Sequence, residues 1–94
     1  MITNETVKFS IIDPPDGKVF VIIVYDIVST KVRNKLIKLI KAYGFRVQKS
    51  VFEAVSTLDK IESLCYKIPN IVNSEEDSVF VYIFSKDFKV WSIG

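Results

Sequence analysis

Seven consecutive apolar residues, Val19 to Tyr25, constrain the fold of this chain more than any other feature. A strand that is apolar on both faces is typical of the centre of a sheet. The run ends at Asp26, and Ser29 or Thr30 can cap a helix directly after it. The sequence therefore predicts a buried central strand that leads into a helix.

Two later stretches carry apolar residues at helical spacing and predict two helices. We expect the first helix to stop at Gly44. Its apolar stripe consists of Val32, Leu36, Leu39, Ile40 and Tyr43. Ser56 or Thr57 can cap the second helix, and Pro69 ends it. Its core face consists of Ile61, Leu64, Cys65 and Ile68.

Further extended segments surround these helices. Phe45 to Val55 changes phase at Lys49-Ser50, so it is either one kinked strand or two short ones. Asp77 to Phe84 is apolar on both faces, and a last short strand, Phe88 to Ile93, contains Trp91. This order predicts an α+β fold of ferredoxin-like type, with two helices on one face of a mainly antiparallel sheet.

The chain of 94 residues fits a single domain, which we place at residues 19–94 together with a C-terminal dimerisation strand. Residues 1–18 form an N-terminal extension. In it, Thr6 to Ile12 can be a strand and Asp13 to Gly17 a turn, so the segment either folds back beside the central strand or frays. A chain this short buries only about 60–65% of its unfolded surface, so a second interface would stabilise it.

Cys65 is the only cysteine, which excludes an internal disulfide and fits a reducing compartment. We interpret it as a small core residue rather than a nucleophile. Residues 1–10 lack the pattern of a signal peptide, and the longest apolar run is far shorter than the ~20 residues of a membrane span. We therefore expect a soluble, cytoplasmic protein with no membrane partner.

A basic window without any acidic residue extends from Ile27 to Phe52 and carries a charge of +7. The rest of the chain has six basic and eleven acidic side chains, hence −5. A merely solvated helix usually mixes both signs, so this window favours an anionic partner over plain solvation. Its basic residues are Lys31, Arg33, Lys35, Lys38, Lys41, Arg46 and Lys49.

The chain has no histidine, which excludes Ser-His-Asp and Cys-His catalysis and histidine-ligated zinc. No P-loop or dinucleotide fingerprint occurs. Carboxylate chemistry remains, and Asp26 stands out because it ends the central strand beside a helix start, where α/β-type sheets place their sites. A carboxylate there can hold Mg²⁺ or Mn²⁺. The alternative is that Asp26 only caps the turn.

Arg46, Gln48 and Ser50 alternate along an extended segment, and Phe52 continues their parity. An arginine, two hydrogen-bonding side chains and an aromatic residue on one face are typical of a strand that reads nucleic acid. The alternative is that Phe52 belongs to the core and Arg46 is a surface charge.

Four motifs stand out along the chain: Val24-Tyr25-Asp26-Ile27, Arg33-Asn34-Lys35-Leu36, Tyr43 to Glu53, and Glu76-Asp77-Ser78-Val79. Together, over roughly residues 19–84, they resemble the CRISPR-associated protein 2 family, the small partner of the CRISPR integrase. The resemblance implies a ferredoxin-like homodimer in which the C-terminal strand joins the partner's sheet. It also implies a role in CRISPR adaptation, the acquisition of new spacers.

The resemblance further implies partners and a site. The partners are the integrase, CRISPR-associated protein 1, and duplex DNA or single-stranded RNA. Several members are metal-dependent endonucleases whose first strand ends in a metal-binding aspartate, so Asp26 would be the catalytic residue and the ligand of Mg²⁺ (or Mn²⁺). The expected nucleic-acid-binding residues are Arg33, Lys35, Lys38, Lys41, Arg46 and Phe52.

Two features depart from the family pattern. Residues 1–18 precede the usual start of the family. Lys35 stands where some relatives carry arginine, and a lysine cannot bind phosphate with the bidentate geometry of arginine. Two functions therefore compete: a metal-dependent endonuclease, and a non-catalytic DNA-binding scaffold that bridges integrase dimers and in which Asp26 is structural. A third option is a ferredoxin-like binding or regulatory module for small ligands, or an RNase toxin of related fold; the basic window argues against the small-ligand module.

Overall fold

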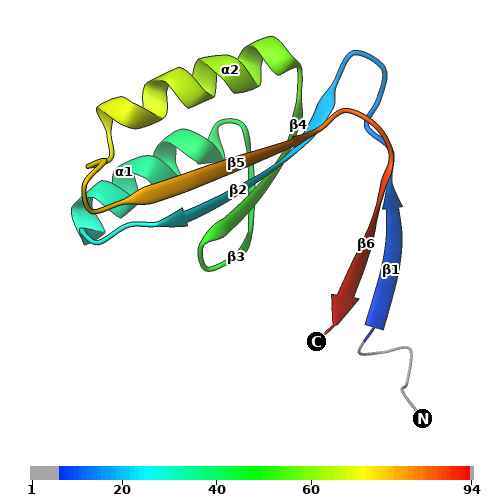
Figure 1. Cartoon of the computed structure of the whole chain (residues 1–94), viewed down its shortest axis with the longest axis horizontal. Coiled ribbons are helices and arrows are strands. Elements are labelled where there is room, and N and C mark those ends of the chain that lie inside the picture. The colour runs from blue at the N-terminus through cyan, green and yellow to red at the C-terminus, as the bar shows by residue number, and fades with distance from the viewer. Residues whose placement is uncertain (1–6, 94) are drawn as a thin grey trace.

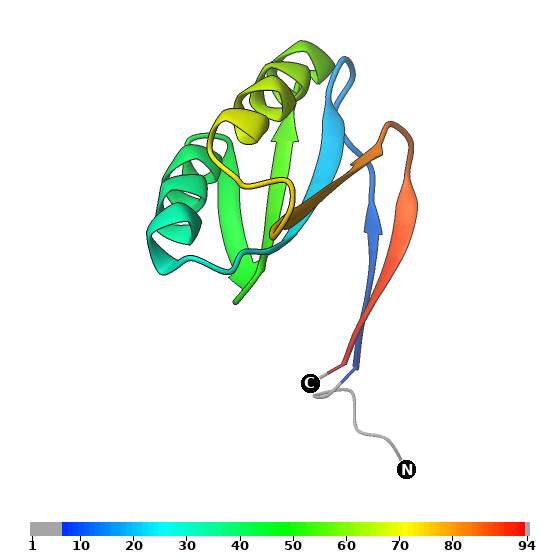
Figure 2. The same cartoon turned by 60° about the vertical axis from the view of Figure 1, so that its left-hand side comes forward.

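The computed structural model describes residues 7–93. Their core is a four-stranded antiparallel sheet in the order β3-β4-β2-β5, formed by Gly44–Gln48, Val51–Ser56, Val19–Asp26 and Ser78–Phe84. Helices α1 (Thr30–Lys41) and α2 (Leu58–Lys67) cover one face of this sheet, as Figures 1 and 2 show from two directions. The ferredoxin-like arrangement of two helices on one face of an antiparallel sheet is confirmed.

Strand β2 lies at the centre because it pairs with β4 on one side and β5 on the other. Alternate residues of a strand point to opposite faces. Val21, Ile23 and Tyr25 are buried against the helices, whereas Ile22 and Val24 face the other side and are half-buried. The apolar run predicts that both faces of β2 are buried, but the face without helices is only half-buried at Ile22 and Val24.

Both helices begin at a side-chain cap, and the apolar stripes of both face the sheet. The hydroxyl of Ser29 accepts a hydrogen bond from the Val32 amide, and that of Thr57 accepts one from the Lys60 amide. The fully buried helical residues are Leu36, Ile40, Ile61 and Leu64. A short 3₁₀ helix, η1 (Ile68–Asn70), follows α2 and contains Pro69. Among the described residues, no helix is long and apolar enough to cross a membrane.

The segment that changes phase at Lys49-Ser50 is a hairpin of two strands, β3 and β4. Gly44 does not end α1, which is capped at Ala42; it opens β3 instead. A Cβ at this position would overlap the carbonyl oxygen of Glu53 and lie 2.8 Å from the Cβ of Ala54. The glycine is thus required for close strand pairing rather than for a helix stop.

The sheet face that carries no helix, here called the open face, is strongly apolar. Register places Ile22 of β2 between Tyr82 of β5 and Glu53 of β4, so these residues share that face. Phe80 and Tyr82 are 56% and 51% exposed, and their rings stack with centroids 6.4 Å apart. The other members of the open face are Phe20, Val24, Phe45, Val51, Val55 and Phe84.

Outside the sheet, β1 (Val7–Ile12) pairs antiparallel with β6 (Phe88–Ile93). The N-terminal strand therefore forms, but its neighbour is the C-terminal strand and not β2. Thr6, the expected first residue of this strand, lies outside the described residues. The two strands make a ribbon that leaves the sheet and projects away from it (Figures 1 and 2).

The close approach at Gly44 generates a stability prediction. Gly44→Ala should destabilise the fold by about 1–3 kcal/mol, because backbone of β4 must move to admit the methyl group. Urea unfolding followed by circular dichroism measures the change. Gly17→Asn is the control: Gly17 has a φ of 76°, which asparagine tolerates, and open space around it. Equal stability of Gly44→Ala and the native chain would contradict the prediction.

Candidate metal and nucleic-acid site

Asp26 is the last residue of β2 and is exposed. It pairs with Ser78 and has the same parity as Ile22 and Val24, so it stands at the margin of the open face. Its carboxylate makes no hydrogen bond or ion pair with any other residue in the described range 7–93. Because Ser29 caps α1, Asp26 is not the turn cap in this structure.

The loop after Asp26 is held by two charged side chains. Arg33 donates from Nη2 to the carbonyl oxygen of Ile27 over 2.8 Å, and the Val28 amide donates to Oδ1 of Asp77 over 3.0 Å. Arg33 is half-buried on the side of α1 that also carries Leu36. Its guanidinium therefore helps to order the loop through one of its N–H groups.

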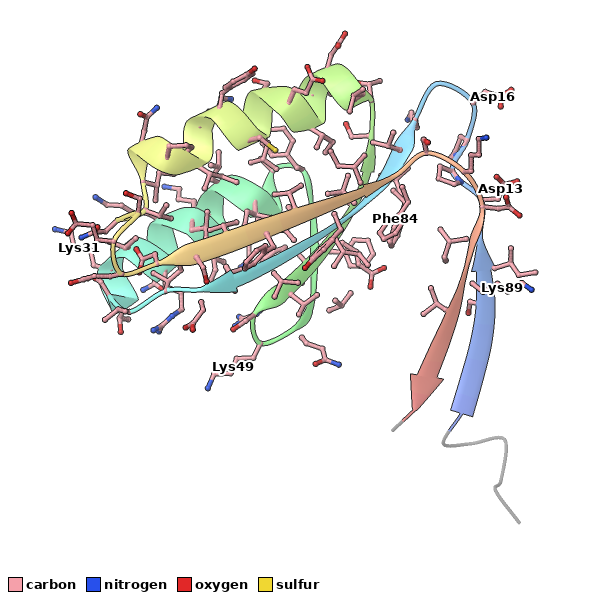
Figure 3. The ribbon with its side chains drawn as sticks, in the orientation of Figure 1. Asp13, Asp16, Lys31, Lys49, Phe84 and Lys89 are labelled. Atoms are coloured by element: carbon pink, nitrogen blue, oxygen red, sulfur yellow. The ribbon has the colours of Figure 1, made fainter. Side chains whose placement is uncertain are left out.

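The β3–β4 turn is fastened to the same end of β2. Lys49 offers its carbonyl oxygen to the hydroxyl of Tyr25 at 3.0 Å and to Nη2 of Arg46 at 2.6 Å. The Tyr25 amide donates to the Ser50 carbonyl oxygen over 3.1 Å. These bonds place the turn next to Asp26, with the side chain of Lys49 pointing outward from its tip (Figure 3). Arg46 is exposed but engaged with this turn.

The lysines of α1 form an exposed basic stripe. Lys31, Lys35 and Lys38 are four and three residues apart, which places them on one side of the helix, and Lys41 flanks them. At 1.5 Å per residue, Lys31 and Lys41 are separated by about 15 Å along the helix axis. A stripe of that length matches a stretch of duplex with about nine phosphate charges.

Phe52, one of the expected nucleic-acid-binding residues, lies in the core, which agrees with the alternative interpretation of this strand. Its side chain is 0% exposed and lies in the core with its ring 6.2 Å from that of Tyr25. It therefore has no free face on which a base could stack. Register pairs Arg46 with Phe52, so both residues lie on the same face of the sheet. Arg46 is exposed because β3 is an edge strand, whereas Phe52 is buried in the neighbouring strand β4.

The donor set tests whether this end of β2 fits a metal. Mg²⁺ prefers oxygen ligands and is usually bound by one or two carboxylates together with phosphate oxygens and water. Asp26 supplies one free carboxylate, and residues 7–93 contain no group of three or more potential metal ligands. The chemistry of Asp26 fits Mg²⁺, although a single copy of the chain supplies too few ligands.

Cys65 offers no competing site. Partial burial raises the pKa of its thiol above the ordinary value, and the negative charge of Glu62 raises it further. The thiol therefore stays protonated at neutral pH, in agreement with its place in the wall of the core.

Sequence reasoning missed two contributors to this region, Asp77 and Tyr25. Asp77 lies 49 residues from the amide that it holds, and the hydroxyl of Tyr25 reaches the turn 24 residues away. The only signal for them in the sequence is that both residues belong to four-residue motifs at the ends of strands.

Residues 19–89 match the family model described as CRISPR associated protein Cas2. A relative from Thermus thermophilus, named CRISPR-associated endoribonuclease Cas2, is 37% identical over 79 residues, which cover 82% of this chain and 84% of the relative. CRISPR-associated endoribonuclease Cas2 3 of Chloroflexus aurantiacus is 38% identical over 65 residues, covering 69% and 70% of the two chains.

Solved structures of similar proteins have the same fold as this chain. The hypothetical protein TT1823 from Thermus thermophilus is 35% identical with a TM-score of 0.68, and the alignment covers 70% of this chain and 80% of that one. Streptococcus pyogenes Cas2 is 29% identical with a TM-score of 0.63, covering 67% and 82%. Residues 19–89 match the family model, and relatives from two organisms are 37–38% identical over more than two thirds of this chain. This chain therefore belongs to the CRISPR-associated Cas2 family.

Proposed function

We propose that the chain acts in CRISPR adaptation as a dimeric, nucleic-acid-binding, Mg²⁺-dependent endonuclease. The observation that carries the proposal is the position of Asp26, an exposed carboxylate without a partner among residues 7–93, at the margin of an apolar sheet face. The names of the Thermus and Chloroflexus relatives, both endoribonucleases, support RNA as a substrate. Duplex DNA is the second candidate nucleic acid.

The open face supports a homodimer. A contiguous patch that contains three aromatic side chains more than half exposed, Phe45, Phe80 and Tyr82, is typical of a protein interface. A two-stranded ribbon such as β1–β6 is also marginally stable by itself, so we place it against the partner subunit. Two open faces related by a two-fold axis would bring both copies of Asp26 toward one another.

The paired copies of Asp26 would supply the two carboxylates that Mg²⁺ lacks in a single chain. When bound, the metal would supply the activation of a water for attack on phosphorus. Asp26 would orient the ion, and the exposed Lys31 and Lys49 would neutralise charge on the phosphodiester. The lysines of α1 would hold the flanking phosphates.

The second candidate function is a non-catalytic scaffold that bridges dimers of the integrase, which is CRISPR-associated protein 1. It is favoured by the engagement of both nearby arginines with backbone carbonyl oxygens. The lysines nearby make no such bonds among the described residues, but lysine lacks the bidentate geometry with which arginine holds phosphate. In the scaffold, the open face would still form the dimer and the basic stripe would still bind phosphates, while Asp26 would have no chemical role.

The basic stripe generates a salt prediction. Replacing both Lys38 and Lys41 by glutamine should make the negative slope of log K against log salt for duplex binding shallower by about 2, because each lost phosphate contact removes about 0.9 from its magnitude. Fluorescence anisotropy over a salt series measures it. The control replaces Lys60 and Lys86, exposed residues outside the basic window. An unchanged slope would mean that Lys38 and Lys41 are only solvated.

The open face and the ribbon generate a prediction about the dimer. Phe80→Lys, and separately a chain that ends at Lys86, should weaken the dimer at least tenfold, because one buries a charge and the other removes β6. Light scattering at several concentrations measures it. Tyr66→Lys is the matched control, since Tyr66 is a 79% exposed aromatic on α2. If the dimer persists after both changes, its interface is formed by another surface.

The final prediction separates endonuclease from scaffold. Asp26→Asn preserves size but removes two negative charges per dimer, so cleavage should disappear while duplex binding stays or improves. Cleavage of labelled RNA and DNA with Mg²⁺ or Mn²⁺ tests this. Asp16→Asn, at the far end of the molecule from Lys31 (Figure 3), is the control. Undiminished cleavage by Asp26→Asn would support the scaffold instead.

A further inference from the structure

The peptide bond between Ile27 and Val28 is held from both sides by opposite charges. Its carbonyl oxygen accepts a hydrogen bond from the guanidinium of Arg33, and its N–H donates to the carboxylate of Asp77. Each bond has one charged partner, and such bonds are stronger than neutral ones. The orientation of this peptide plane is therefore set by two side chains, one on α1 and one immediately before β5.

Asp77 is itself rigidly placed. Its second oxygen, Oδ2, accepts from the Asn73 amide at 2.9 Å, and its own amide donates to the Asn73 carbonyl oxygen at 2.8 Å. The side chain of Asn73 accepts from the Glu75 amide at 3.0 Å. With both oxygens of Asp77 engaged by backbone amides, this carboxylate serves to hold the loop and is not free to bind a metal.

The clamped peptide begins at Ile27, the residue after Asp26. Register pairs Asp26 with Ser78, the residue next to Asp77, so the clamp and the free carboxylate lie at adjacent ends of β2 and β5. On the other side, the buried Ile27 side chain anchors the same peptide in the core. The chain can therefore leave β2 in only one direction, which fixes the backbone that presents Asp26.

We propose that Asp77 is a positioning residue for Asp26, acting with Arg33 through the Ile27–Val28 peptide. The proposal rests on the role given to Asp26 in the proposed function. It assigns Arg33 to the order of the site rather than to direct contact with phosphate. It also accounts for two charged groups that the phosphodiester chemistry does not otherwise use.

Asp77→Asn tests the proposal because it keeps size while replacing one acceptor oxygen by an NH₂ group that cannot accept. Glu76→Gln is the matched control: it removes the same charge from an exposed neighbour whose side chain makes no hydrogen bond in the described structure. Arg33→Gln releases the same peptide from its other side and serves if Asp77→Asn fails to fold.

Three NMR measurements read the result. In Asp77→Asn, hydrogen exchange of the Val28 amide should accelerate at least tenfold, the order parameter of the Asp26 amide should fall, and the Mn²⁺ concentration that half-broadens Asp26 should rise on the order of tenfold. Glu76→Gln should leave all three within twofold of the native chain.

The outcomes separate this proposal from the proposed function. Faster Val28 exchange with unchanged Asp26 order overturns the positioning role, since the clamp would then be only structural. If Mn²⁺ fails to broaden Asp26 even in the native chain, the metal site is wrong, and the order of Asp26 alone decides the present proposal. Equal Val28 exchange in all variants overturns the clamp itself.

Discussion

The antiparallel pairing of β2 with both β4 and β5 is the interaction on which the rest of the molecule depends. It satisfies the backbone of an apolar strand from two sides and lets Val21, Ile23 and Tyr25 face the helices, where each buried side chain stabilises the fold by about 1.5–3 kcal/mol. The same alternation gives Asp26 the parity of the open face. A strand register that suits the core thus also decides where the candidate ligand points.

Arginines and lysines are used differently around this strand. Arg33 and Arg46 donate to backbone carbonyl oxygens and hold the loops on either side of Asp26. The planar fork of arginine suits such fixed contacts, whereas lysines on long flexible stems stay solvated and can follow an irregular anion. In the basic window, both arginines therefore contact the backbone around the site, while the lysines are the residues that we propose for phosphate contact. The proposed scaffold and endonuclease functions share this division and differ only in the use of Asp26.

The ribbon and the open face are the parts of this small fold that its own core does not cover. β1 lies outside residues 19–89, the part that matches the family, yet it takes one edge of β6. An unpaired strand edge invites uncontrolled association, and β1 covers one such edge. In the proposed dimer, β6 would meet the partner subunit through the edge that β1 leaves open.

Local patterns in the sequence determined the helices, the strands and the basic window, because each depends on residues only a few positions apart. The fold class and the place of Asp26 at the end of a buried strand followed from the same patterns and from four family motifs. The sequence alone left open whether Phe52 belongs to the core, because the burial of Phe52 depends on the place of β4 inside the sheet, between β3 and β2. Only the tertiary structure showed the pairing of β1 with β6 and the clamp of Asp77 on Val28 across 49 residues. Such contacts depend on which segments the folded core brings together, and no local periodicity encodes that.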